Sequence, residues 1–262
     1  MLSHIVVAVM ALIASGLTLF SGFGLGTILM PVFALFFPLT VAIPATAVVH
    51  LANNLFKVAL VGRHANWSVL LRFAPAAAFA AIIGAWLLGL LADLPVVARY
   101  ELLGEMREIS PVKLTIGLMI IAIAALELSP RFSALAFPPK FLILGGLISG
   151  FFGGLSGNQG AFRSAFLLRA GLDKEAFVAT GVIASVIVDT FRLAVYGLSF
   201  YATSFAALGG EVGGVVATAI LAAFLGAYIG ARLLKKVTLR FVQFVVAATM
   251  VVIGMGLAVG VL

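Results

Sequence analysis

Long apolar segments that carry almost no charge follow one another along nearly the whole chain. The run from Trp67 to Leu91, for example, contains one ionisable residue, Arg72. A stretch of about 20 apolar residues is long enough to span the hydrocarbon core of a bilayer. Over all 262 residues, 64% are hydrophobic and 10% are charged, whereas roughly a quarter of a soluble domain is charged. The sequence therefore predicts an integral membrane protein and leaves no stretch for a soluble domain.

The apolar segments form two series that resemble each other in order and spacing. Ser15-Gly16 matches Ser149-Gly150, the sequence FKVALVG at 56–62 matches FRLAVYG at 191–197, and IGAW at 83–86 matches LGAY at 225–228. Anchors that keep the same order with a slowly growing offset indicate a duplication. We therefore expect an all-α integral membrane fold of two repeats, residues 1–128 and 129–262, with about five segments each. The segments are 4–20, 26–37, 41–62, 67–91 and 112–128, then 140–155, 160–170, 174–197, 208–233 and 239–261.

The second segment of each series is too short to cross a bilayer. At 1.5 Å per residue, 26–37 and 160–170 span about 17 to 18 Å against a hydrocarbon core of ~30 Å. Each follows a glycine-rich break, SGFGLG at 21–26 and GGLSGNQG at 153–160. We read each repeat as starting with a broken or re-entrant helical hairpin, because irregular backbone at membrane depth requires protein or a water-filled cavity around it.

Such a hairpin returns to the side that it entered, so each repeat makes an odd number of net crossings and the two repeats are inverted. In this topology, ten of the sixteen basic residues lie on one side. Basic loops face the cytoplasm, so both termini and the loop 93–113 are expected in the periplasm. The ten residues are Arg63, Arg72, Arg131, Lys140, Arg169, Lys174, Arg232, Lys235, Lys236 and Arg240.

Inverted repeats with discontinuous helices are typical of transporters, whose half-helix N-termini point at anionic groups near the bilayer midplane. The two breaks are therefore predicted to bind substrate through backbone amides and small polar side chains. The alternative is that the glycines only let helices pack closely. The candidate residues are Ser21, Gly22, Gly24, Gly26 and Thr27 in the first break, and Ser156, Gly157, Asn158 and Gln159 in the second.

A polar stripe within the apolar segment 41–62 adds further candidates. His50, Asn53, Asn54 and Lys57 fall on one helical face at 100° per residue. In the second repeat, Asp189 aligns with Asn54 and Arg192 aligns with Lys57. Ionisable groups inside a membrane segment are candidates for function, and we assign Lys57 and Arg192 to the substrate and Asp189 to coupling.

Simpler roles for these side chains stay open. Lys57 and Arg192 could snorkel to the interface, Asp189 could simply pair with Arg192 one turn away, and His50 could be a packing histidine. Arg163, just inside the second break, could hold an anion bidentately or reach the cytoplasmic interface.

Taken together, the break SGFGLG, the stripe ATAVVHLANNLFK at 45–57 and the second break GGLSGNQGAF at 153–162 resemble the sulfite exporter TauE/SafE family of membrane permeases. The resemblance runs over essentially the whole chain. It implies transport of small sulfur-containing anions, of the sulfite, sulfonate, sulfoacetate or thiosulfate type, across the inner membrane of a prokaryote. The expected function is ion-coupled export by alternating access, without a cofactor. Proton and sodium are the candidate coupling ions, and a homodimer is the candidate assembly.

Other functions fit the sequence less well. A passive anion channel could use the same repeats, because channel and carrier both need a lined pathway. Gly154-Leu155-Ser156-Gly157 fits the GxSG pattern of rhomboid serine proteases, but all three histidines precede Ser156, whereas rhomboids supply the catalytic histidine from a later helix. The absence of cysteine and the scarcity of intramembrane acids argue against a metal site. The net charge of +7 is explained by membrane topology rather than by nucleic-acid binding.

Overall fold

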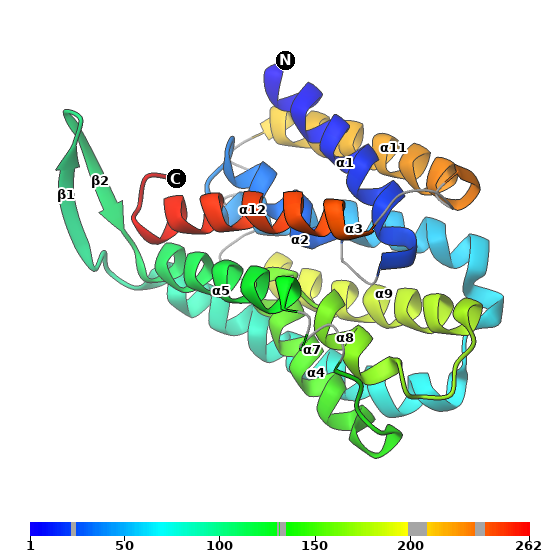
Figure 1. The fold of residues 1–262 in the computed structure, drawn as a ribbon. Helices are drawn as coiled ribbons and strands as arrows, with labels where there is room; N and C mark the ends of the chain where they lie inside the picture. The colour runs from blue at the N-terminus through cyan, green and yellow to red at the C-terminus, as the bar shows by residue number, and fades with distance from the viewer. Residues whose placement is uncertain (22–24, 130, 132–134, 199–208, 234–238) are drawn as a thin grey trace.

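The computed structural model describes residues 1–21, 25–129, 131, 135–198, 209–233 and 239–262, with the backbone alone at 17–21, 127, 209, 231–233, 239–243, 245 and 246. The described chain is almost entirely helical, as expected (Figure 1). Its α-helices are α1 (Leu2–Ser21), α2 (Leu25–Ala34), α3 (Leu39–Val61), α4 (Trp67–Asp93), α5 (Pro111–Leu128), α7 (Leu142–Ser156), α8 (Gly160–Leu167), α9 (Lys174–Leu198), α11 (Gly209–Leu233) and α12 (Leu239–Ala258). There are also two short 3₁₀ turns, η1 (Gly62–His64) and η2 (Pro139–Phe141). The described strands are β1 (Ala98–Leu102) and β2 (Glu105–Ile109).

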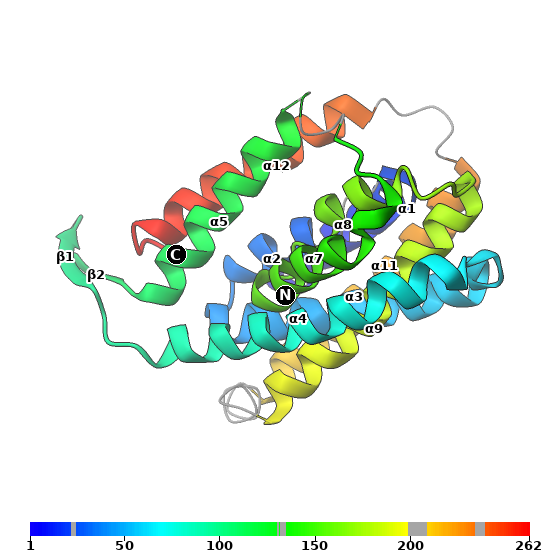
Figure 2. The ribbon, with the colours of Figure 1, turned by 90° about the horizontal axis from the view of Figure 1, so that it is seen from below.

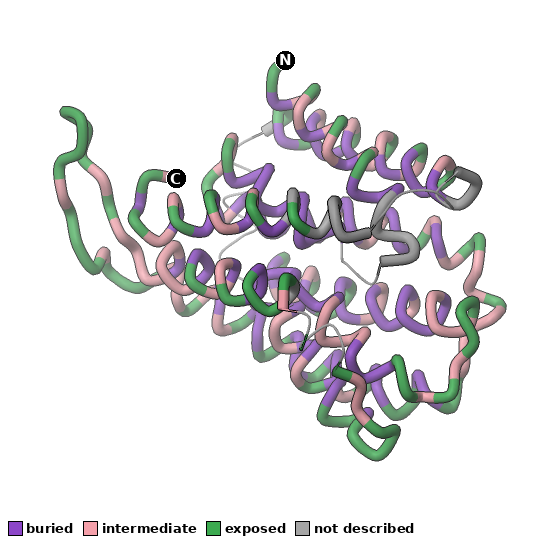
Figure 3. Tube along the Cα trace, viewed as in Figure 1, coloured by how far each residue is buried: buried purple, intermediate pink, exposed green. Residues whose placement is uncertain are grey.

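Several of these helices have the length and composition of membrane spans. Within the described residues, five segments qualify: Leu39–His64, Trp67–Asp93, Pro139–Ser156, Lys174–Leu198 and Gly210–Gly230. Large apolar side chains are exposed along their outer faces, for example Trp86 (60%) and Leu221 (69%). Figure 3 shows the buried positions gathered on the inward faces of the helices. The outer surface is therefore suited to lipid, and the polar groups lie inside.

Local sequence signals set where the long helices begin. Asn66 caps α4 by accepting a hydrogen bond from the backbone N–H of Val69 (3.1 Å). Ser110 caps α5 in the same way through Lys113 (3.3 Å), and Pro111 occupies the first turn, where its missing N–H costs nothing. These caps fix where α4 and α5 begin.

The two predicted short helices are present and are shorter than their apolar runs. α2 has ten residues and α8 has eight, so they extend about 15 Å and 12 Å. Neither is long enough to cross a hydrocarbon core. α8 folds back along the start of α7, where Phe137 N–H donates to the Ala165 carbonyl (3.0 Å) and the rings of Phe137 and Phe166 stack. The second hairpin therefore leaves and returns to the same end of the molecule.

Glycines let α7 lie directly on the backbone of α4. A Cβ on Gly150 would stand 2.6 Å from the Cα of Ala77, closer than any real contact allows. The neighbouring glycines at four-residue spacing, Gly146 and Gly154, meet Phe73 and Ala81 in the same way. Because the contacts advance together along both helices, α7 and α4 run parallel.

Two further helix pairs, α1 with α11 and α5 with α12, also pack closely through glycine. Gly226 and Gly230 of α11 contact the backbone of Leu12 and Gly16 of α1, so α1 and α11 are parallel as well. α5 and α12 pack antiparallel, and a Cβ on Gly117 would stand 2.7 Å from the backbone nitrogen of Ala258. Figure 2 shows α5 and α12 side by side. Each of these pairs joins a helix from residues 1–128 to one from 129–262.

Two contacts place the C-terminus and the loop 93–113 at the same end of the helix bundle. The Tyr100 hydroxyl donates to the backbone carbonyl of Val259, and Arg107 Nη1 lies 3.5 Å from that of Val261. At the opposite end, His64 pairs with Glu175 (3.3 Å), which joins the loop after α3 to the start of α9. The C-terminus and the loop 93–113 therefore lie together, at the end of the bundle opposite the loop after α3.

The loop 93–113 contains a β-hairpin that we did not anticipate. β1 and β2 pair antiparallel from Ala98 with Ile109 to Leu102 with Glu105. Its two-residue turn has positive φ at both positions, 55° at Leu103 and 81° at Gly104, as in a type I′ turn. Glycine adopts this conformation readily, but leucine does so rarely. The hairpin is mostly exposed and extends beyond the helices (Figures 1 and 3).

Candidate anion-binding site

The break between α7 and α8 is shaped by a left-handed glycine. Gly157 has φ 85°, and its N–H donates to the Gly153 carbonyl (2.9 Å) to end α7. Ser149 Oγ donates to the Gln159 carbonyl (3.0 Å), and Asn158 Nδ2 donates to Ser156 Oγ (3.0 Å). The break is therefore a defined turn, and the protein satisfies most of its polar groups.

Two acceptors in this break have no described hydrogen-bond partner. Asn158 Oδ1 and Gln159 Oε1 are both buried, in residues that are 2% and 1% exposed. Gln159 Nε2 faces Asp189 Oδ1 (3.3 Å), which fixes the amide orientation and leaves its oxygen unsatisfied. A buried polar atom without a partner is costly. The break thus has hydrogen-bonding capacity that the described protein leaves unused.

The first break lies partly outside the described residues. Gly22 and Gly24 are not described, and Ser21 is described by its backbone alone. Gly26 and Thr27 lie in the first turn of α2 and are buried, with Thr27 2% exposed. A Cβ on Gly26 would stand 3.2 Å from the carbonyl oxygen of Gly157 and 3.8 Å from His50 Cδ2. The start of α2 therefore meets the second break directly, with His50 beside both.

Asp189 of α9 is the centre of the polar network. Its carboxylate lies 2.6 Å from His50 Nδ1, 2.8 Å from Arg192 Nη2 and 3.3 Å from Gln159 Nε2. Asp189 is fully buried, and His50 is 3% exposed. The carboxylate thus links α3, α9 and the second break. It also supplies the i,i+3 partner that the sequence suggested for Arg192.

Arg192 is enclosed because Gly157 has no side chain. Its Nη1 donates to the Gly153 carbonyl (3.1 Å), and a Cβ on Gly157 would stand 2.8 Å from the same nitrogen. Arg192 is 0% exposed and its Nε has no described hydrogen-bond partner. The guanidinium therefore packs against the break itself and does not reach the outer surface of the bundle.

Asn54 joins this network from α3. Its Nδ2 lies 3.1 Å from His50 Nδ1 and 3.5 Å from Asp189 Oδ2. Asn54 and Asp189 are the residues that align between the two halves of the sequence. Residues at matched positions thus approach each other at the centre of the molecule.

Lys57 is buried in a separate polar cluster between α1, α3 and α11. It is 4% exposed. With the Asn53 amide oxygen facing Lys57 Nζ (3.2 Å), the amide nitrogen donates to Ser15 Oγ (2.9 Å) and to the Ala223 carbonyl (3.3 Å). This orientation gives every polar atom of the Asn53 side chain a partner. Lys57, like Arg192, therefore points into the protein.

Arg163 of α8 lies on the α9 side of the second break. Nη1 donates to Ser185 Oγ, and a Cβ on Gly181 would stand 3.2 Å from its Nε. Arg163 is partly buried. Its guanidinium thus packs across α9, on the side of the break from which the chain leads to the basic loop containing Arg169.

Sequence reasoning missed two components of these clusters. Ser15 and the carbonyl of Ala223 hold Asn53, although Ser15 had been noted as a repeat anchor. Its match Ser149 also bonds within a polar cluster, to the second break. A serine conserved between the halves was therefore a usable signal, whereas a backbone carbonyl on α11 has no sequence signature.

The geometry offers no support for a protease at Ser156. Its described hydrogen bonds are to the Phe152 carbonyl (3.1 Å) and from Asn158. A serine nucleophile needs a general base within hydrogen-bond reach. Among the described contacts, His50 bonds Asp189 and Asn54 and none joins a histidine to Ser156.

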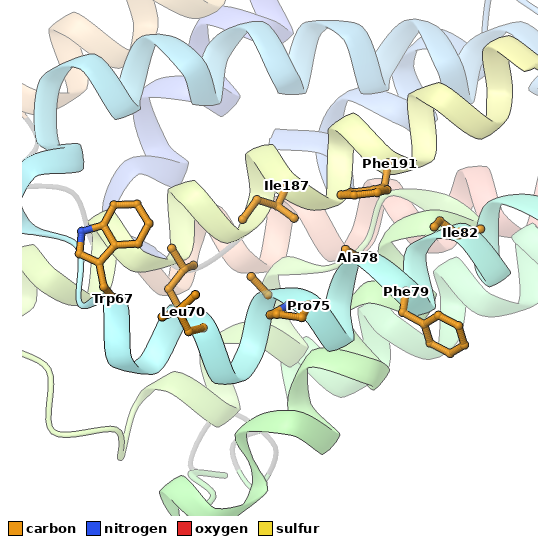
Figure 4. A pocket seen from close by; sticks show the side chains of 10 residues that line it. Trp67, Leu70, Pro75, Ala78, Phe79, Ile82, Ile187 and Phe191 are labelled. Atoms are coloured by element: carbon orange, nitrogen blue, oxygen red, sulfur yellow. The ribbon is translucent and has the colours of Figure 1, made fainter.

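A groove on the outer face between α4 and α9 is unsuited to an anion. It has a volume of about 460 Å³, and the side chains around it are apolar (Figure 4). They include Trp67, Phe79 and Phe191. Since the groove contains no charged group, it is suited to an acyl chain. The candidate anion-binding groups lie on the inside of the bundle.

Comparison with known proteins identifies the family. Searches among curated proteins and among solved structures found no match. The model of the sulfite exporter TauE/SafE family matches residues 7–257, which is nearly the whole chain and includes both breaks and both polar clusters. The chain therefore belongs to the sulfite exporter TauE/SafE family.

Proposed function

We propose that this chain exports small sulfur-containing anions such as sulfite across the inner membrane of a prokaryote, by ion-coupled alternating access. Membership of the family implies a membrane transporter of sulfur anions such as sulfite. The observation that supports this site most strongly is the meeting of the two breaks at Gly26 and Gly157, beside His50. Helices α2 and α8 both begin at these breaks, and a helix N-terminus favours an anion.

Buried positive charge inside the helix bundle supports an anionic ligand. Arg192 and Lys57 are both enclosed by protein, and Arg163 packs beside the second break. Asp189 offsets one of these charges. A small anion that leaves water needs such compensation, because burying one unpaired charge costs on the order of several kcal/mol.

The repeat proposal draws support from which helices pack together. α1 lies on α11 while α7 lies on α4, and α5 lies on α12. In the repeat alignment, α1 corresponds to α7, α4 to α11 and α5 to α12. Replacing each helix by its counterpart therefore turns the pair α1–α11 into α7–α4, and leaves the pair α5–α12 unchanged. The approach of Asn54 to Asp189 has the same symmetry. We therefore retain residues 1–128 and 129–262 as two inverted repeats.

The basic loops support the proposed orientation. Arg63, Arg169 and Lys174 lie at the end of the bundle opposite the C-terminus and the loop 93–113, where His64 pairs with Glu175. Basic loops are cytoplasmic, so the termini and the hairpin would face the periplasm.

A transport assay tests the function and separates a carrier from a channel. Purified protein in liposomes loaded with unlabelled sulfite should accumulate labelled sulfite from outside transiently, because a carrier exchanges bound anions. Flux without counterflow or saturation would favour a passive channel. Arg192→Gln should remove the exchange, whereas Arg72→Gln, at an exposed position on α4, should preserve it. Exchange that survives Arg192→Gln would contradict the proposed site.

A further inference from the structure

Lys57 and Arg192 occupy matched positions but differ in their counter-ions. Arg192 lies 2.8 Å from the carboxylate of Asp189. For Lys57 the corresponding position, one turn earlier, is Asn54. The described ion pairs do not include Lys57, whose described partner is the neutral amide of Asn53. Lys57 is therefore a buried amine surrounded by neutral dipoles.

The elements around Lys57 provide no described negative charge nearby. α1 contributes Ser15 and α11 contributes the Ala223 carbonyl. The titratable groups of these helices are His4, near the first turns of both, and Glu211, Tyr228 and Arg232 of α11; the side chain of Arg232 lies outside the described residues. On α3 itself, His50 is bonded to Asp189. The positive charge of Arg163 repels a positive charge on Lys57. While no anion is bound, a positive charge on Lys57 is therefore repelled by Arg163 and is not balanced by any described negative charge nearby.

We propose that Lys57 takes up a proton when the anion binds, so that the anion and one proton occupy the site together. This inference rests on the proposed transport function and adds the coupling ion to it. The lone pair of the Lys57 amine forms an N–H bond to a proton delivered by water, and the resulting ammonium is the counter-ion of the substrate. When the anion leaves, that N–H bond breaks and the proton returns to water on the same side.

Asp189 is less suited to this role than its sequence position suggested. Its carboxylate already has three close partners: the His50 ring nitrogen, the Arg192 guanidinium as an ion pair, and the Gln159 amide nitrogen. Asn54 Nδ2 lies further away, at 3.5 Å. Protonating the carboxylate would weaken all three close contacts and leave Arg192 without its partner. Asp189 is therefore a positioning residue, which holds the second break and Arg192 in place.

Coupling at Lys57 determines the charge that moves with each substrate. Proton and anion cross in the same direction, so a doubly charged anion such as sulfite carries one net negative charge. An inside-negative membrane potential drives that charge outward. Export of a dianion therefore gains from the potential, even though the accompanying proton moves outward.

Calorimetric titration of the full-length protein in detergent with sulfite tests this proposal. At one pH, titrations in two buffers of different ionisation enthalpy give the number of protons taken up per anion bound. Wild type should take up about one proton more than Lys57→Arg, whose guanidinium is always charged. The protonation of sulfite itself cancels in this difference. Lys140→Arg, the same change at an exposed lysine, should match wild type.

The outcomes separate this proposal from the transport function. Wild type that binds no sulfite would contradict the proposed function. Wild type that binds sulfite with the same proton uptake as Lys57→Arg would overturn the role of Lys57 alone. If Lys57→Arg does not fold, Lys57→Gln should bind at least tenfold more weakly and take up about one proton less than wild type. Uptake that persists in Lys57→Gln but disappears in Asp189→Asn would place the proton on Asp189 and overturn the proposal.

Discussion

His50 Nδ1 lies 2.6 Å from Asp189 Oδ2, joining α3 to α9 at the point where the two helix breaks meet. Both side chains are buried. Removing one partner of a buried pair is costly, because the other charge loses its compensation. Here the carboxylate would keep Arg192 and Gln159 but lose its shortest contact.

We expect His50→Ala to destabilise the protein by up to about 3 to 5 kcal/mol, the range for broken buried pairs. His64→Ala provides the control, because His64 pairs with the exposed Glu175 and such pairs contribute about 1 kcal/mol or less. Thermal unfolding in detergent should show a large drop for the first variant and a small one for the second. Equal drops would show that the buried pair has no special role.

Gly157→Leu should abolish transport while the protein still accumulates in the membrane. Leucine at φ 85° costs about 1 to 2 kcal/mol in backbone strain, and its Cβ would stand 2.8 Å from Arg192 Nη1. Gly213→Leu on α11 is the control, since a Cβ there meets nothing within 4 Å. Sulfite exchange by Gly157→Leu at the rate of the control would reduce the break to a packing element. The same test at Gly24 concerns a residue outside the described structure.

Arg163→Gln should weaken sulfite binding by roughly tenfold or more, because a hydrogen bond to a charged group contributes about 1.5 to 3 kcal/mol. The side chain already bonds Ser185, so the neutral replacement keeps a donor and removes the charge. Arg72→Gln, on the exposed face of α4, changes the net charge equally. Direct titration should separate the two variants. Equal affinities would assign Arg163 to packing or to the interface.

Cysteines introduced at the two ends of the bundle should show opposite accessibility. In this cysteine-free chain, Glu105→Cys in the exposed hairpin should react with an impermeant maleimide from the periplasm. Lys174→Cys, at the exposed start of α9, should react only after the cells are permeabilised. Labelling in the reverse pattern would invert the proposed orientation. Lys236, another basic loop residue, lies outside the described part of the chain.

Gly150→Val should reduce the amount of folded protein. Its side chain would collide with the backbone at Ala77, which cannot move without separating α7 from α4. Overpacking in a core costs about 1 to 3 kcal/mol, and a backbone collision falls at or above that range. Gly89→Val on α4 has open space around it and should be tolerated. Size-exclusion profiles of the two variants in detergent would reveal the difference.

The sequence predicted features that depend on local spacing. The short lengths of α2 and α8 follow from their apolar runs and the glycines beside them. The contact of Asp189 with Arg192 follows from their i,i+3 spacing. Helical periodicity placed His50, Asn53, Asn54 and Lys57 in one stripe, but the structure divides it. His50 and Asn54 contact Asp189, whereas Asn53 and Lys57 form a separate cluster with Ser15.

Contacts between distant segments required the structure. Nothing in the spacing indicates that His50 bonds a carboxylate 139 residues away, since that depends on how α3 and α9 cross. The hairpin at 98–109 was missed because Leu103 adopts a turn conformation that glycine usually provides. Ala223 accepts a hydrogen bond from Asn53 through its backbone carbonyl. Since every residue has such a carbonyl, the sequence could not single out Ala223.

The pairing of α1 with α11, of α7 with α4 and of α5 with α12 has a consequence for biogenesis. When the ribosome has made residues 1–128, α1, α4 and α5 lack the helices that contact their backbones. The first half must therefore remain in the bilayer with three uncovered helix faces, which are covered only when α7, α11 and α12 are inserted. A chain interrupted after Leu128 should be recovered by supplying its second half as a separate polypeptide, because each of these contacts joins a helix of one half to a helix of the other.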